Sequence, residues 1–170
     1  YSLHVNQSED SELFHKEHLA NPKKDPRLEL IKQLISDCGV AGDILVYNIN
    51  FERSRLRELI EQFPNYKSPL QAIVERLKDL MIPFQNKWYY TPKMRGSYSI
   101  KNVLPALAPK LSYNGLNIND GGTASSIFQS MVNDNFKGDE LLTKKDLLEY
   151  CKLDTYAMVV ILNKLKAVCL

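Results

Sequence analysis

The sequence predicts a mixed α/β domain, and three patterns indicate it. The chain opens with alternating apolar and polar residues, has an unbroken apolar run at residues 44–46, and then shows several segments with apolar residues at helical spacing. Alternation is typical of a half-buried strand, and an unbroken run is typical of a strand covered on both faces. Strands followed by alternating strand and helix favour an α/β arrangement. The 170 residues fit a single domain.

The first elements are expected to be a hairpin and a helix. Residues 1–5 alternate in the period of a strand, and residues 13–19 form a second strand after a polar stretch, which favours an antiparallel hairpin. Asp25 followed by Pro26 is a typical helix start. Apolar residues at helical spacing continue from there to Gly39, a typical helix end.

Further helices are predicted along the rest of the chain. Their apolar residues recur every three or four positions, and their ends carry capping residues. The aromatic segment 84–91 is expected to be extended. The predicted helices cover residues 56–63, the segment from Ser68-Pro69 to Leu80, residues 99–107, the segment after Gly121-Gly122, and the segment from a capping box at Thr143 and Asp146 to the end of the chain.

Composition argues against a membrane-spanning protein and against a protein stabilised by disulfides. The net charge is only +2, and no apolar run is long enough for a membrane span. The three cysteines, Cys38, Cys151 and Cys169, are far apart and form no CxxC pair. We therefore expect free thiols in a cytoplasmic protein that has no membrane partner.

One segment differs in charge from the rest. Residues 80–119 contain no carboxylate side chain, and their cations alternate with aromatic residues. Proteins that bind single strands use this mixture, because aromatic rings stack on bases and cations follow the phosphates. Alternatively, Trp88 and Tyr90 belong to the core and the lysines only solubilise the chain. The candidate substrate-binding residues here are Lys87, Trp88, Lys93, Arg95 and Lys101.

Two polar motifs are candidates for chemistry. Residues 48–52, Asn-Ile-Asn-Phe-Glu, follow the most buried predicted strand, and ligand sites of open α/β sheets gather at such strand ends. Tyr150 and Asp154 are four residues apart on the last predicted helix and therefore share one face. A carboxylate and a phenol on one face can hold a metal and orient a water molecule. Alternatively, these residues are turn, cap and surface residues.

Together the two motifs resemble the second and third motifs of the DEDD superfamily of 3′–5′ exonucleases, in its tyrosine subclass. The matching patterns are Asn-x-x-Phe-Glu at residues 48–52 and Tyr-x-x-x-Asp at residues 150–154. Residues 78–80 resemble the strand after the second motif, and residues 96–101 resemble the Ser-Leu-Lys element that follows. Over residues 40–160 the chain is similar to a bacterial domain family of unknown function assigned to this superfamily. The resemblance implies a ribonuclease-H-like mixed sheet flanked by helices.

The resemblance also implies a mechanism. Asp154 and Glu52 would bind two Mg²⁺ or Mn²⁺ ions, and Tyr150 would orient the attacking water. Asn48 would brace the loop or contact the nucleic-acid backbone, with Asn50 and Phe51 beside it at the substrate. Asn48, Glu52, Tyr150 and Asp154 should then converge on one pocket. The expected partners are a single-stranded nucleic-acid end and the rest of a longer parent chain.

One motif of the superfamily has no match. The first motif is Asp-x-Glu after an apolar strand, and the only candidate, Asp10-Ser11-Glu12, lies in a polar stretch that we interpret as a hairpin turn. Residues 1–170 are therefore expected to be a single exonuclease-type domain that is a fragment of a longer protein, lacks its first, central strand, and is inactive alone. The gap would leave unpaired backbone groups, so we expect two copies to associate through it.

A second interpretation remains open: a non-catalytic ribonuclease-H-like module that binds nucleic acid or protein. A small-molecule enzyme is disfavoured because no Gly-rich phosphate loop or nucleophile elbow is present. His15 and His18 suggest a metal site, but in a strand they would face opposite sides of the sheet. We therefore interpret both as surface residues.

Overall fold

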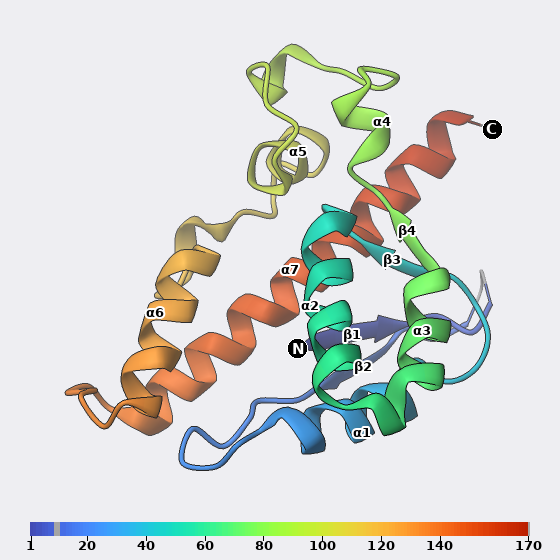
Figure 1. The fold of residues 1–170 in the computed structure, drawn as a ribbon. Helices are drawn as coiled ribbons and strands as arrows, with labels where there is room; N and C mark the ends of the chain where they lie inside the picture. Colours follow the sequence, from blue (N-terminus) through green and yellow to red (C-terminus); the bar gives the residue numbers. More distant parts are fainter. Residues whose placement is uncertain (9–10, 170) are drawn as a thin grey trace. The chain divides into compact units, whose positions relative to one another are not determined.

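The computed structural model describes residues 1–8 and 11–169 and confirms a mixed α/β fold (Figure 1). The contacts divide the chain into two compact units. The first unit holds Tyr1–Pro26 and Ser112–Tyr156, and the second holds Arg27–Leu111 and Ala157–Leu170. The finer expectations, a ribonuclease-H-like sheet without its central strand and the association of two copies, stay predictions.

An antiparallel hairpin is the sheet of the first unit. β1 (Ser2–Val5) pairs with β2 (Phe14–Glu17), and the register places His4 opposite His15. The predicted hairpin is therefore confirmed, while Asp10 of the Asp10-Ser11-Glu12 candidate lies outside the described residues. The other elements of this unit are a 3₁₀ turn η3 (Tyr113–Gly115), α6 (Gly121–Val132) and, as far as Tyr156, α7 (Glu140–Cys169).

A parallel pair of strands is the sheet of the second unit. β3 (Ile44–Val46) pairs with β4 (Leu77–Asp79), and the register aligns Val46 with Asp79 (Figure 1). This confirms the strand expected from the unbroken apolar run. The helices and 3₁₀ turns are α1 (Arg27–Cys38), α2 (Ile49–Gln62), η1 (Pro64–Tyr66), α3 (Lys67–Glu75), α4 (Ile82–Gln85), η2 (Pro92–Met94) and α5 (Ile100–Leu107).

One hydrophobic cluster holds α1, α2, α3 and the parallel strands together. Each helix contributes the apolar stripe that its spacing predicts, and both strands contribute apolar side chains between the helices. Full burial of one such aliphatic side chain contributes about 1.5–3 kcal/mol, so this cluster contributes strongly to the stability of the unit. Its buried members are Ile31, Val46, Leu56, Leu70, Ile73, Val74 and Leu77.

Arg76 organises the connection between α1 and β3. Its guanidinium donates to the carbonyl oxygens of Cys38, Gly39, Ala41 and Gly42 at 2.7–3.3 Å. The last carbonyls of a helix have no partner within the helix, and the planar five-donor guanidinium can satisfy several acceptors together. Arg76 therefore both caps α1 and holds the loop that leads into β3.

Residues 84–91, which we expected to be extended, form a short helix and turns. Pro83 lies in the first turn of α4, a position that proline favours. Phe84 is 2% exposed, and its ring meets the edge of Tyr89 at 5.9 Å between centroids. Lys87 has a φ of 58°, which is left-handed and incompatible with a strand. The prediction was wrong because aromatic composition favours strands, whereas the proline and the burial of Phe84 favour a turn.

Two helix boundaries also differ from the prediction. The helix expected to carry Leu77 and Leu80 ends at Glu75, and Leu77 belongs to β4. α7 begins at Glu140, ahead of the expected cap at Thr143, because the carboxylate of Asp139 accepts the Leu142 N–H at 3.0 Å. Within the described residues, no helix combines the length and apolar character that a bilayer crossing demands.

Candidate functional site

The turn after β3 is the first of the predicted sites, and Asp79 organises it. Its carboxylate, at the end of β4, accepts the N–H groups of Asn48 at 3.1 Å and Ile49 at 3.0 Å, both at the start of α2. It also accepts the Met81 N–H at 2.9 Å. A carboxylate at a helix N-terminus satisfies free donors and interacts favourably with the helix dipole. Asp79 therefore fixes the turns that follow both parallel strands.

The structure places the motif of residues 48–52 around this turn. Asn48 is the N-cap of α2 in the left-handed conformation, with φ 79° and no side-chain cap hydrogen bond. Asn50 and Phe51 are exposed, and the Arg55 guanidinium lies over the Phe51 ring at 6.0 Å. Glu52 is half-buried in the first turn of α2. The role of Asn48 that the structure shows is conformational.

A tyrosine–aspartate cluster (Tyr113, Tyr150 and Asp154) forms the second predicted site. The Tyr113 hydroxyl donates to Asp154 Oδ1 at 2.7 Å, and the rings of Tyr113 and Tyr150 are 6.1 Å apart. Both tyrosines are buried, with exposed fractions of 5% and 7%. Burial first, and then the negative charge of Asp154, raise the pKa of Tyr150 far above its usual range. The phenol therefore keeps its proton at neutral pH.

Asp120 lies near the same phenol, at the N-terminus of α6. Its carboxylate accepts the Thr123 N–H at 2.8 Å and the Thr123 hydroxyl at 2.5 Å. Its charge also contributes to the raised pKa of Tyr150. A Cβ at Gly121 would lie 3.6 Å from the Tyr150 hydroxyl, so this oxygen is close to the first residue of the helix.

The two predicted motifs belong to different units. Asn48 and Glu52 are in the second unit, whereas Tyr150 and Asp154 are in the first. Their convergence on one pocket therefore stays a prediction. Among the residues that the structure describes, no three His, Cys, Asp or Glu side chains form a group that could hold a metal ion.

The acid-free segment presents a basic aromatic surface (Lys87, Trp88, Tyr90, Lys93, Arg95, Tyr98 and Lys101) in the second unit. All of these side chains are exposed, and Trp88 is 74% exposed. The alternative that Trp88 and Tyr90 are core residues is therefore wrong, because Phe84 and Met94 fill the core at this point, with exposed fractions of 2% and 1%.

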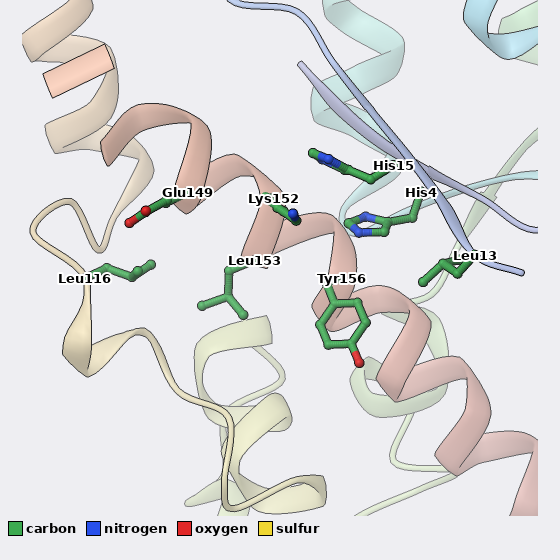
Figure 2. Close-up of a pocket in the computed structure, with 8 residues that line it drawn as sticks. All are labelled: His4, Leu13, His15, Leu116, Glu149, Lys152, Leu153 and Tyr156. Atoms are coloured by element: carbon green, nitrogen blue, oxygen red, sulfur yellow. The ribbon is translucent and has the colours of Figure 1, made fainter. Parts of the chain in front are cut away.

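A groove of about 480 Å³ lies between the hairpin and α7, entirely within the first unit (Figure 2). We call it the hairpin groove. Figure 2 shows His4 and His15 on the hairpin, across from Lys152 and Tyr156 on α7. The lining residues are His4, Leu13, His15, Leu116, Glu149, Lys152, Leu153 and Tyr156.

Two hydroxyl groups hold the histidines of the hairpin groove. Thr155 Oγ1 lies 2.8 Å from His4 Nδ1 and 2.8 Å from Ser2 Oγ. Ser2 Oγ in turn lies 2.9 Å from His15 Nε2. Burial, followed by the charges of His15 and Lys152, lowers the pKa of His4 to about 4. His4 is therefore neutral at physiological pH, and the interpretation of His15 as a plain surface residue was incomplete.

Several of these residues were missed by the sequence analysis. Tyr113 lies in a polar segment of Ser, Asn and Gly with no periodic pattern, so no local signal marks it. Asp120 could have been found, because Asp three residues ahead of Thr123 after a loop is a typical helix start. His4 could have been paired with His15 only by fixing the register of the hairpin.

Comparison with known proteins places the chain in a family. The model of a domain of unknown function (DUF2779) matches residues 1–99, which is more than half of the chain. The chain belongs to the DUF2779 family. This confirms the expected membership of a domain family of unknown function.

A curated relative of the DUF2779 chain is "Uncharacterized protein UU173" of Ureaplasma parvum serovar 3, which is 26% identical over 145 residues. The match covers 72% of the DUF2779 chain but only 20% of the relative. The chain therefore spans about a fifth of the length of the curated relative that it matches. No solved structure matches the chain.

Substitutions at Asn48 test whether its conformation or its side chain matters. Glycine adopts the left-handed region without steric cost, whereas alanine pays about 1 kcal/mol there. We expect Asn48→Ala to lower the free energy of unfolding by about 1 kcal/mol and Asn48→Gly to leave it nearly unchanged, measured by urea denaturation. Asn50→Ala, at an exposed position, is the matched control. Equal losses in the alanine and glycine variants would instead show that the amide side chain stabilises the turn.

Acid sensitivity tests the environment of His4. Its pKa is about 4 in the folded chain, against a reference value of 6.5, so the unfolded chain binds more protons between these values. Above pH 6.5, protonation of His4 does not lower the free energy of unfolding. As the pH falls from 6.5 toward 4, the unfolded chain takes up the proton first, and the free energy of unfolding decreases. Between these two pH values, urea denaturation should show a smaller loss of stability in His4→Gln than in the wild type. Identical pH profiles would contradict the lowered pKa.

Proposed function

We propose that the DUF2779 chain carries part of the active site of a metal-dependent 3′–5′ exonuclease that hydrolyses phosphodiester bonds of DNA or RNA. The tyrosine–aspartate cluster carries the proposal, because a buried phenol and a carboxylate share one face of α7, one turn apart. The resemblance to the tyrosine subclass assigns water orientation to Tyr150 and metal binding to Asp154. The position of Glu52 in the helix that follows a buried parallel strand gives further support.

The geometry of the cluster supports a separate role for each residue in the proposed reaction. The raised pKa of Tyr150 makes the phenol a hydrogen-bond donor that orients a water molecule, and unsuited to be a general base at neutral pH. The bond from the Tyr113 hydroxyl to Asp154 Oδ1 restricts rotation of that carboxylate. Tyr113 is therefore a positioning residue, because it acts through Asp154.

The donor chemistry fits a hard divalent cation. Carboxylate oxygens are the preferred ligands of Mg²⁺ and of Mn²⁺, and Glu52 and Asp154 would supply them. When bound, the ions would polarise a phosphate oxygen and lower the pKa of a water molecule.

Hydrolysis of a 5′-labelled single-stranded oligonucleotide by the full-length gene product tests the proposal. Degradation should require Mg²⁺ or Mn²⁺, and Asp154→Asn should reduce the rate at least about 100-fold, because a neutral amide is a poor ligand for a hard cation. Tyr150→Phe should lower the rate less and leave Mn²⁺ affinity unchanged.

Asp146→Asn is the matched control, because Asp146 lies on the same helix and its carboxylate accepts from the Asn117 side chain. It should retain full activity, and thermal unfolding checks that each variant folds. Full activity in Asp154→Asn would refute the assignment. A gene product that binds the oligonucleotide with metal present but never cleaves it would refute the exonuclease.

The basic aromatic surface favours a second candidate function, a non-catalytic module that binds single-stranded nucleic acid. Exposed tryptophan and tyrosine side chains are surrounded by cations with no carboxylate in residues 80–119. Stacking of a base on an aromatic ring contributes about 1–3 kcal/mol and needs no specific sequence. This function requires only the second unit.

Trp88 is the only tryptophan, so intrinsic fluorescence reports on this surface directly. We expect an oligonucleotide of thymidine to quench it, with affinity that falls as salt rises. Lys93→Gln combined with Arg95→Gln removes two cations and should flatten the slope of log K against log salt by about 1.4. Lys32→Gln combined with Arg57→Gln, on exposed positions of α1 and α2, should not change the slope. Quenching that is absent, or equally salt-dependent in both double variants, would contradict binding at this surface.

A further inference from the structure

We propose that His4 and His15 form a two-histidine site for a divalent transition-metal ion of the Zn²⁺, Ni²⁺ or Cu²⁺ class. The site lies in the hairpin groove, whose lining includes neither of the carboxylates of the proposed exonuclease, Glu52 and Asp154. It does not depend on that function, because both ligands belong to one hairpin of the first unit.

The hairpin brings the two ring centroids to a separation that a chelating pair of histidines would have. His4 and His15 are direct partners in the antiparallel register, so their side chains leave the same face of the sheet. Their ring centroids are 4.6 Å apart, with an angle of 37° between the planes. An ion bonded at about 2.0–2.1 Å to one nitrogen of each ring would separate the centroids by roughly 4.5–5.2 Å. The observed separation falls within that range.

Each ring has one nitrogen held by a hydroxyl group. Thr155 Oγ1 is 2.8 Å from His4 Nδ1, and Ser2 Oγ is 2.9 Å from His15 Nε2. The two hydroxyls are 2.8 Å apart, so one connected chain orients both rings. Metal-binding histidines commonly have their second nitrogen fixed in this way, which sets the tautomer. The nitrogens that would bind the ion are therefore His4 Nε2 and His15 Nδ1.

Access to the two rings favours binding. Both histidines line the open hairpin groove, so hydrated ions can reach them from solvent (Figure 2). Besides His15, the groups that face the ring of His4 are Thr155, Tyr156 and Lys152, and Glu149 also lines the groove.

The ligand type selects the class of ion. Imidazole nitrogen suits Zn²⁺, Ni²⁺ and Cu²⁺, whereas Mg²⁺ requires oxygen ligands. No third protein ligand completes a cluster among the described residues, so water or an external ligand would fill the remaining positions. The site therefore resembles an open coordination site more than a closed structural one.

Titration of the untagged 170-residue chain with NiCl₂ and CuCl₂ tests the proposal. We expect a single site by calorimetry, two nitrogen couplings from imidazole in the Cu²⁺ electron paramagnetic resonance spectrum, and no competition from a large excess of Mg²⁺. His4→Gln and His15→Gln should each weaken binding at least about tenfold, since each removes one of two ligands. In the wild-type chain, paramagnetic Ni²⁺ should broaden the ring signals of His4 and His15 first, which requires no variant.

His18→Gln is the matched control. His18 stacks on Tyr1 at 5.8 Å between ring centroids and does not line the hairpin groove. Affinity unchanged by His18→Gln would support the site. A tenfold loss in His18→Gln, with none in His4→Gln, would instead place binding at His18 and the chain's amino group. A single coupled nitrogen, or competition by Mg²⁺, would also refute the pair.

Discussion

The carboxylate of Asp79 is the constraint on which the chain path of the second unit depends. Parallel strands end at the same edge of a sheet, so a side chain at the end of β4 can reach the turn after β3. Asp79 uses this position to bind the start of α2 and the residue that leads into α4. The hydrogen bonds to Ile49 and Met81 are half-buried, so water replaces them only in part if the carboxylate is removed. One carboxylate therefore determines where two helices begin.

This constraint also explains the conformation at Asn48. The chain leaves β3 and enters α2 within two residues, which demands a sharp change of direction. A left-handed residue provides that change, and asparagine tolerates the left-handed region better than most side chains. The same neighbourhood holds Tyr47, whose pKa rises through burial and then through the charge of Asp79, and whose hydroxyl donates to the Tyr98 carbonyl at 2.6 Å.

Elements governed by local pattern could be predicted from the sequence. The hairpin, β3 and the amphipathic helices follow from alternation, an unbroken apolar run and helical spacing, all of which need only neighbours along the chain. Leu77 shows the limit, because its position fits a helical stripe but the parallel pairing with Ile44 places it in a strand. Phe84 shows the same limit, since burial rather than composition decides its conformation.

The candidate sites depend on contacts between residues that are far apart in the sequence, which local patterns do not reveal. Tyr150 and Asp154 could be recognised because their spacing lies within one helix, whereas Tyr113 joins them from 41 residues ahead of Asp154. His4 and Thr155 are 151 residues apart and share a hydrogen bond. His15 and His18 are three apart in sequence, yet the partner of His15 is across the hairpin. Register and long-range packing therefore decide which polar residues meet.

The contacts of Arg76 indicate which residues determine the shape of the loop after α1. All of its acceptors in the loop after α1 are main-chain carbonyls, which every amino acid possesses. Only Gly39 and Gly42, with φ values of 56° and 87°, restrict side-chain choice there, and Val40 is 99% exposed. Related sequences could therefore diverge freely at Val40 and Ala41 while the loop keeps its shape. Apart from these two glycines, the side chain that specifies this loop is one arginine more than thirty residues away.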